Sequence, residues 1–199
     1  MNRTALTFLF AGLAAGVASV AIGRVWPTVL ISGVGVLFFA ALLIAIAISG
    51  SWARLRPGLW RYLVGLVIST AAYLVGLFAF SVVGGYAPDV LGIPASSDIS
   101  RFGADVGTGL LAAALISSVC IELLASILTG RWSNRFFLFL AVAGFVTVAA
   151  TYVAHVFTRQ PLAFFGALLP VGEALYCWIV GLQISQSREE APSPYHGRG

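Results

Sequence analysis

The chain has 199 residues, of which 60% are hydrophobic and 9% are charged, and its mean hydropathy is +1.00. A soluble domain of this size cannot bury so much apolar surface in one core, so the composition excludes soluble globular classes and indicates lipid as the solvent. All 11 basic residues are arginine, and they lie at the ends of apolar runs. The net charge of +4 therefore indicates membrane topology, and no nucleic-acid partner is expected.

Apolar runs of about 20 residues predict membrane-spanning helices, because the hydrocarbon core of a bilayer is about 30 Å thick. Such runs occur six times between charged or turn residues. They predict an all-α bundle of six transmembrane helices, in one domain over residues 1–184, at residues 5–23, 28–49, 62–84, 106–129, 136–157 and 162–184.

The connections predict how these helices pair. Those after the first and fifth helices are very short, which predicts a bundle of three antiparallel hairpins. The longest polar stretch, 85–105, carries three aspartates and two prolines and is expected to be a loop. Its last residue, Asp105, suits the N-terminus of the fourth helix. The polar tail at 185–199 also contains two prolines and is expected to be disordered.

Arginine placement predicts the orientation, because positive charge is retained on the cytoplasmic side of a membrane. Eight arginines fall on the side of the two termini and three on the other side, so both termini are expected in the cytoplasm. Aromatic residues at the span boundaries agree, because their rings settle at the headgroup level. These are Trp26, Trp52, Trp60, Trp132 and Tyr86. The lack of lysine and the abundance of alanine, glycine and arginine favour a bacterial inner membrane.

The N-terminus allows a second interpretation. Arg3, an apolar run and the small residues around Ala18 and Ala21 resemble a secretory signal peptide, whose cleavage near residue 21 would leave five helices. Two features argue against cleavage. The apolar run is long for a signal peptide, and the GxxxG spacing of Gly12 and Gly16 suits close packing on a neighbouring helix.

Two helix ends resemble each other, Ile48-Ser-Gly-Ser-Trp52 and Leu128-Thr-Gly-Arg-Trp132, and Cys120 and Cys177 each precede an arginine by eleven residues. A repeated hairpin is one interpretation. Coincidence in apolar sequence is the other. The cysteines form no CxxC pair and are expected to be small buried apolar residues.

Three ionisable residues lie within the predicted spans: Glu122, Glu173 and His155. A charge in hydrocarbon costs at least a few kcal/mol, so such residues persist where they are sheltered or useful. Glu173 lies in the middle of the sixth helix, three residues after Pro170, which frees a backbone carbonyl. Tyr176 follows at i+3 and shares its face.

Polar residues accompany both glutamates. Ser118 and Ser126 flank Glu122 at i−4 and i+4, which gives the fourth helix a narrow polar face. On the sixth helix, Gln183 lies roughly along the stripe of Glu173.

The fifth helix repeats the pattern with Thr147, Thr151 and His155 at four-residue intervals. If these faces meet, a polar path leads from His155 near the outer surface through Glu173 to Glu122 nearer the cytoplasm. Such a path could pass protons, a cation or a small polar solute. The residues predicted to line it are Glu173, Glu122, His155, Tyr176, Ser118 and Thr151.

Each of these residues also has a structural interpretation. Serine and threonine in membrane helices commonly bond the carbonyl at i−4, and a protonated glutamic acid can hydrogen-bond to a neighbouring helix. Tyr73, midway along the third helix, is expected to pack.

Catalytic signatures are missing from the sequence. It has no HExxH pair, no paired histidines within its spans, no glycine-rich phosphate loop and no lysine for a Schiff base. No catalytic residue, metal or cofactor is therefore expected. The leading hypothesis is a small transporter or its membrane component. The alternative is a non-catalytic subunit of a larger membrane complex, and an intramembrane enzyme ranks third because these catalytic sets are missing. Expected partners are the bilayer and either other membrane subunits or further copies of this chain.

Overall fold

The computed structural model of the chain describes residues 3–25, 27–55, 58–94, 98–158 and 161–186, with the backbone alone at 27–32, 53–54, 98–103, 151–152, 154–158 and 161–167. This part of the chain is all-helical, as predicted. Its elements are α1 (Arg3–Val25), α2 (Pro27–Ile48), the short 3-10 helix η1 (Ser51–Arg54), α3 (Leu59–Val90), α4 (Asp98–Thr129), α5 (Asn134–Thr158) and α6 (Pro161–Gln186).

Four of the six helices begin and end within two residues of the predicted spans, namely α1, α2, α5 and α6. Both α2 and α6 begin with proline. Proline has no backbone N–H group, and at the first position of a helix that group would have no partner within the helix. Gly50 and Gly130 follow α2 and α4 in the left-handed conformation, with φ of 64° and 81°, which stops a helix. The resemblance between residues 48–52 and 128–132 thus includes a shared way of ending a helix.

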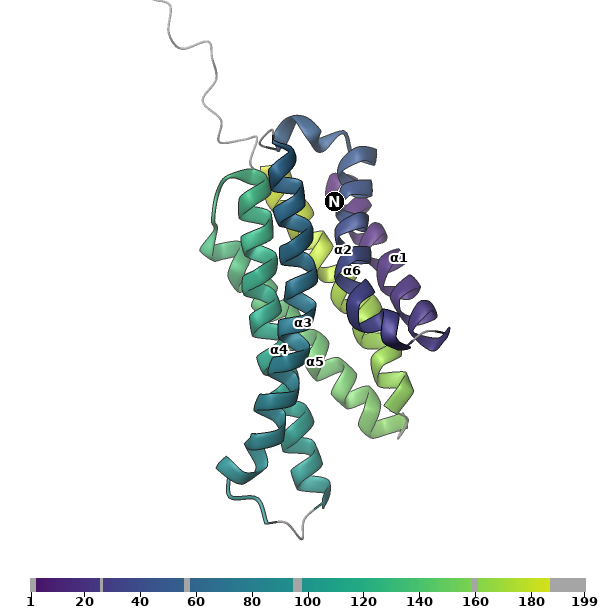
Figure 1. Cartoon of the computed structure of the whole chain (residues 1–199), viewed down its shortest axis with the longest axis vertical. Helices are drawn as coiled ribbons and strands as arrows, with labels where there is room; N and C mark the ends of the chain where they lie inside the picture. The colour runs from purple at the N-terminus through teal and green to yellow at the C-terminus, as the bar shows by residue number, and fades with distance from the viewer. Residues whose placement is uncertain (1–2, 26, 56–57, 95–97, 159–160, 187–199) are drawn as a thin grey trace, which may run out of the picture.

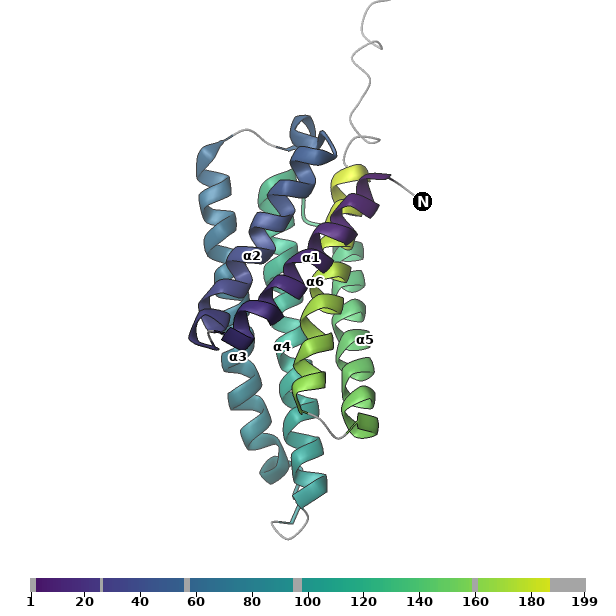
Figure 2. The ribbon, with the colours of Figure 1, turned by 90° about the vertical axis from the view of Figure 1, so that its right-hand side faces the viewer.

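The predicted loop at 85–105 is wrong for most of its length. α3 continues to Val90 and α4 begins at Asp98, so Asp105 lies inside α4 and not at its N-terminus. The added turns persist because α3 and α4 pack on each other there: a Cβ on Gly84 would lie 2.6 Å from the backbone carbonyl oxygen of Asp105. Each helix has 32 residues, which corresponds to about 48 Å, and the α3–α4 pair extends beyond the other helices (Figures 1 and 2).

Several helices have the composition of membrane spans. Four are long and apolar enough to cross a bilayer, over Arg3–Val25, Leu59–Val90, Ala104–Thr129 and Leu168–Gln186. Shorter apolar stretches occupy Gly33–Ile48 in α2 and Asn134–Ala150 in α5. Large apolar side chains project from the outside of the bundle and are more than half exposed, among them Phe10, Ile44, Phe78, Leu138 and Phe145. Such a surface suits lipid, and these features support a multi-pass membrane protein.

The contacts between the helices form a closed ring. Each packs against the next along the chain, and α1 also packs on α6, more extensively than on α2. The beginning of α1 and the end of α6 lie at the same end of the bundle (Figures 1 and 2). Figure 1 shows this end, which the arginines predict to be cytoplasmic, at the top.

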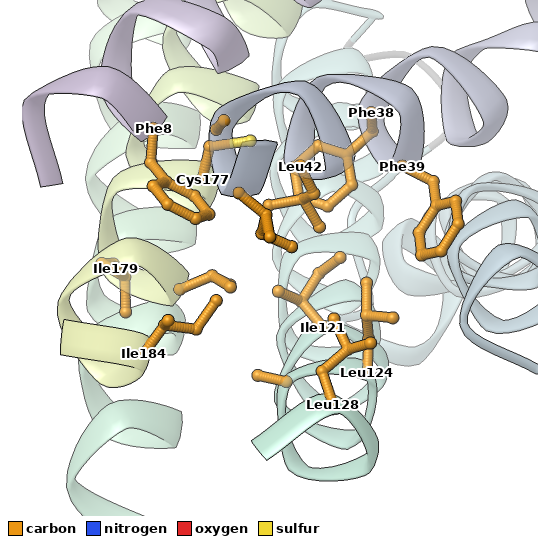
Figure 3. Close-up of a cluster of buried hydrophobic side chains, with 14 of the residues drawn as sticks. Phe8, Phe38, Phe39, Leu42, Ile121, Leu124, Leu128, Cys177, Ile179 and Ile184 are labelled. Carbon is orange, nitrogen blue, oxygen red and sulfur yellow. The ribbon is translucent and has the colours of Figure 1, made fainter. Parts of the chain in front are cut away.

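A cluster of buried apolar side chains fills the half of the bundle nearer the termini (Figure 3). It includes Phe8 of α1, Leu42 of α2, Leu124 of α4 and Ile184 of α6, all fully buried. Cys177 belongs to this cluster, in agreement with its predicted role as a small apolar residue. We call these side chains the inner cluster.

Candidate functional site: a central cavity at Glu173

A cavity of about 470 Å³ lies between α2, α3, α4, α5 and α6, and the residues around it place it mostly in the half of the bundle farther from the termini. Its wall is mainly apolar. Glycines from four helices are among the residues that line it: Gly35, Gly76, Gly144 and Gly172. The described polar side chains on the wall are Ser69, Tyr73, Ser117, Thr147, Glu173 and Tyr176, and Glu173 is the single acidic or basic one among them.

Glu173 reaches the cavity from α6 and is 6% exposed. Its Oε1 accepts a hydrogen bond from the Ser19 hydroxyl of α1 at 3.2 Å. Its Oε2 is buried and has no hydrogen-bond partner among the described residues. Leaving a buried polar atom unpaired costs about 1–3 kcal/mol, so this oxygen would gain from a hydrogen-bond donor.

The GxxxG pair of α1 brings Ser19 to Glu173. A Cβ on Gly12 would collide with the backbone carbonyl of Glu173 and lie 2.8 Å from Cys177 Cβ. A Cβ on Gly16 would lie 2.7 Å from the nitrogen of Pro170. The close packing that the spacing predicted is therefore present, and α6 at Glu173 is the helix that it contacts.

Tyr176, predicted to share the face of Glu173, also lines the cavity. Its hydroxyl lies 3.3 Å from Ser118 Oγ and donates to the Ala114 carbonyl at 3.3 Å. Ser118 itself donates to the Ala114 carbonyl at 2.7 Å, and Thr147 donates to the Ala143 carbonyl at 2.7 Å. These last two bonds follow the i−4 pattern of the structural interpretation.

Glu122 occupies a different place. It is fully buried, and its Oε1 accepts from the Ser133 backbone N–H at 2.8 Å, from Gln183 Nε2 at 3.0 Å and from Ser126 Oγ at 3.5 Å. Its Oε2 has no hydrogen-bond partner. These contacts tie α4 to the start of α5 and to α6. Gln183, placed by the sequence on the stripe of Glu173, therefore bonds to Glu122 instead.

The structure thus unites part of the predicted path. Glu173, Tyr176 and Thr147 share the cavity, Ser118 contacts Tyr176, and Glu122 is not among the residues that line the cavity wall. The side chains of Thr151 and His155 lie outside the described part of the chain.

Several contributors to the site were missed by the sequence interpretation, among them Ser117 of α4. Ser19 was considered only as part of a cleavage site, although it continues the face of Gly12 and Gly16 three residues later. Ser69 and Tyr73 line the cavity from α3, and Ser69 donates to the Gly35 carbonyl of α2 at 2.6 Å. Isolated serines and tyrosines in an apolar helix give no periodic signal, so only packing identifies them.

The cavity can hold a small molecule whose surface is mostly apolar and that offers one donor or positive group to Glu173. The aromatic rings of Phe38, Tyr73, Phe80 and Tyr176 on its wall also suit a cation, whose charge is attracted to ring faces. Comparisons of the chain with protein families, with curated proteins and with solved structures gave no match.

Proposed function

We propose that this chain is a small membrane transport protein, or the membrane component of one, that binds its solute in the central cavity at Glu173. The observation that carries the proposal is the combination of a 470 Å³ cavity with a buried carboxyl oxygen that has no partner. Buried acidic residues in membrane helices commonly mark the route of an ion or a substrate. A bacterial inner membrane is the proposed location.

The solute that best suits this wall is compact, mainly apolar and cationic. One carboxyl group on an apolar wall fixes the orientation of such a molecule, while the aromatic rings contribute to its affinity. A strongly polar solute such as a sugar would leave most of its hydroxyl groups without partners on this wall.

The inner cluster supports a transport cycle. Phe38 and Ile121 belong both to the cavity wall and to this cluster, which fills the bundle between the cavity and the end with the termini. A solute moving toward that end would require these side chains to separate. In the proposed cycle, the inner cluster is the closed gate on the side predicted to be cytoplasmic.

The charge requirement is tested with a matched pair of probes, benzyltrimethylammonium and its uncharged isostere neopentylbenzene. Binding to the detergent-purified chain is measured for wild type and Glu173→Gln. Wild type should prefer the cation, and the variant should bind it about tenfold or more weakly, because the attraction between the carboxylate and the quaternary ammonium charge is lost. Affinity for the isostere should hardly change.

Equal binding of the cation by wild type and Glu173→Gln would contradict the role of the carboxyl group. The alternative function, a non-catalytic subunit, is addressed by the same variant in its own membrane. A subunit should retain its partner chains and the activity of their complex after Glu173→Gln, whereas a transporter should lose flux. Native mass spectrometry of the wild-type chain from that membrane would reveal a stoichiometric partner.

A further inference from the structure

A second hollow, of about 240 Å³, lies on the surface at the end of the bundle that carries the termini. One side is the first turn of α3, with Trp60 and Arg61, and the other is the end of α4 and the turn after it, with Ser126, Arg131 and Trp132. No acidic side chain is among the described residues that line it. We call this hollow the arginine groove.

Arg61 is the most unusual residue of the groove. Its guanidinium carbon lies 5.3 Å from the centre of the Trp60 ring, a cation–π contact that restrains the side chain. Its Nε and Nη1 atoms are buried and have no hydrogen-bond partner in the part of the chain that the structure describes. Unpaired donors on a charged group are costly to bury, so Arg61 would gain from an acceptor placed in the groove.

The rest of the groove suits an anion at the membrane surface. Arg131 adds a second positive charge from the opposite side. Trp60 and Trp132 are about half exposed at its edges, where amphipathic rings mark the headgroup level of a bilayer. The buried carboxyl of Glu122 accepts from Ser126, which lines the groove, and from two further donors through Oε1.

We propose that the arginine groove binds a phosphate group, with the headgroup of an anionic membrane lipid as its source. Guanidinium groups match the oxygens of phosphate better than any other side chain, and the groove lies where lipid phosphates are found. A phosphate group in the groove would lie beside the Arg61 guanidinium, with the positive charge of Arg131 on the opposite side. This site is separate from the central cavity and does not depend on what the cavity transports.

The test uses native mass spectrometry of the full chain in mild detergent, with phosphatidylglycerol and phosphatidylcholine supplied in equal amounts. Wild type should retain phosphatidylglycerol preferentially, and Arg61→Gln should bind it about tenfold more weakly, the effect expected for losing charge-assisted hydrogen bonds. The control is Arg135→Gln. Arg135 lies near the same end of the bundle, 5.4 Å from the Phe139 ring centre, but does not line the groove, so its loss should leave lipid binding unchanged.

A parallel titration with inorganic phosphate distinguishes the source of the phosphate group. If phosphate raises the melting temperature of wild type but not of Arg61→Gln, and no lipid preference is seen, the groove still binds phosphate but takes it from a soluble compound. Unchanged lipid retention in Arg61→Gln, without a phosphate effect, would overturn the proposal. An equal loss in Arg135→Gln would overturn it too, because bulk charge would then explain the preference. If Arg61→Gln fails to fold, Arg61→Lys, which keeps the charge, replaces it in the same lipid and phosphate measurements.

Discussion

Glu122 and Glu173 are both buried in helices, but their carboxyl groups have different surroundings. Three donors converge on Oε1 of Glu122, from α4, the start of α5 and α6. Among the described residues, Glu173 has one donor, Ser19, and its side chain lines the cavity. The second oxygen of each carboxyl group is buried without a partner in the described part of the chain, so the two residues differ in the number of donors and in their position relative to the cavity.

Substitution of Glu122 should therefore change the stability of the protein more than its binding of a cationic solute. Glu122→Ala leaves the Ser133 N–H without its acceptor and removes the partner of Gln183 Nε2, and it should lower the free energy of unfolding by about 1–3 kcal/mol. Glu122→Gln keeps a side-chain oxygen in place and should cost less. Thermal melting of both variants in one detergent measures the difference. If the Gln variant is as unstable as the Ala variant, the negative charge itself is what the junction requires.

At the scale of elements, α1 is held to α6 by backbone proximity. Gly12 and Gly16 let the two helices approach so closely that no side chain fits between them, and this approach carries Ser19 to Glu173. Small residues have this role in membrane helices because dispersion contacts between backbones replace the hydrophobic effect.

Two glycines of this helix pair provide a matched test. Gly12→Ala places a methyl group against the Glu173 carbonyl and Cys177 Cβ, and overpacking of this kind costs about 1–3 kcal/mol. Gly172→Ala places the same group 3.6 Å from Thr147 Cγ2, an ordinary contact on the cavity wall, and removing a helical glycine should stabilise by up to about 1 kcal/mol. Melting temperatures should thus move in opposite directions. A neutral Gly12→Ala would show that α1 and α6 pack less closely in solution.

Helices α3 and α4 are longer than the apolar runs in the sequence predict. The turns that contain Asp89 and Asp105 carry a charged residue each and lie beyond the predicted apolar runs, yet they are helical, and the two helices pack on each other at Gly84 and Asp105. A bilayer limits the apolar part of a helix, not the helix itself. The ends of α3 and α4 are thus expected to project into water on the side opposite the termini.

At the scale of the whole molecule, the orientation can be tested with single cysteines in a variant lacking Cys120 and Cys177. Val90 is 83% exposed at the end of α3, and Gln186 is exposed at the end of α6, at the opposite end of the bundle. A membrane-impermeant maleimide should label Val90→Cys in intact cells and Gln186→Cys only after permeabilisation. The reverse pattern would contradict the orientation that the arginines predict.

The ring of helix contacts also places the cavity in the middle of the bundle. Five helices surround the central space, while large side chains fill the half of the bundle nearer the termini. One bundle thus contains both a densely packed end and a central cavity. That division is what a binding site with one closed side requires.

The sequence alone determined the membrane class, the all-helical fold, the approximate ends of four helices and the acidic residue on the cavity wall. These properties depend on local composition: apolar length, helix-stopping glycines, and the cost of a carboxyl group in an apolar run. Tertiary structure decided the pairing of α1 with α6, the extra length of α3 and α4, the separation of Glu122 from the cavity, and the groove at Arg61. Each of these properties depends on which helices pack against one another. A helix that is apolar on all sides has no hydrophobic periodicity, so its sequence does not show which side packs against a neighbour.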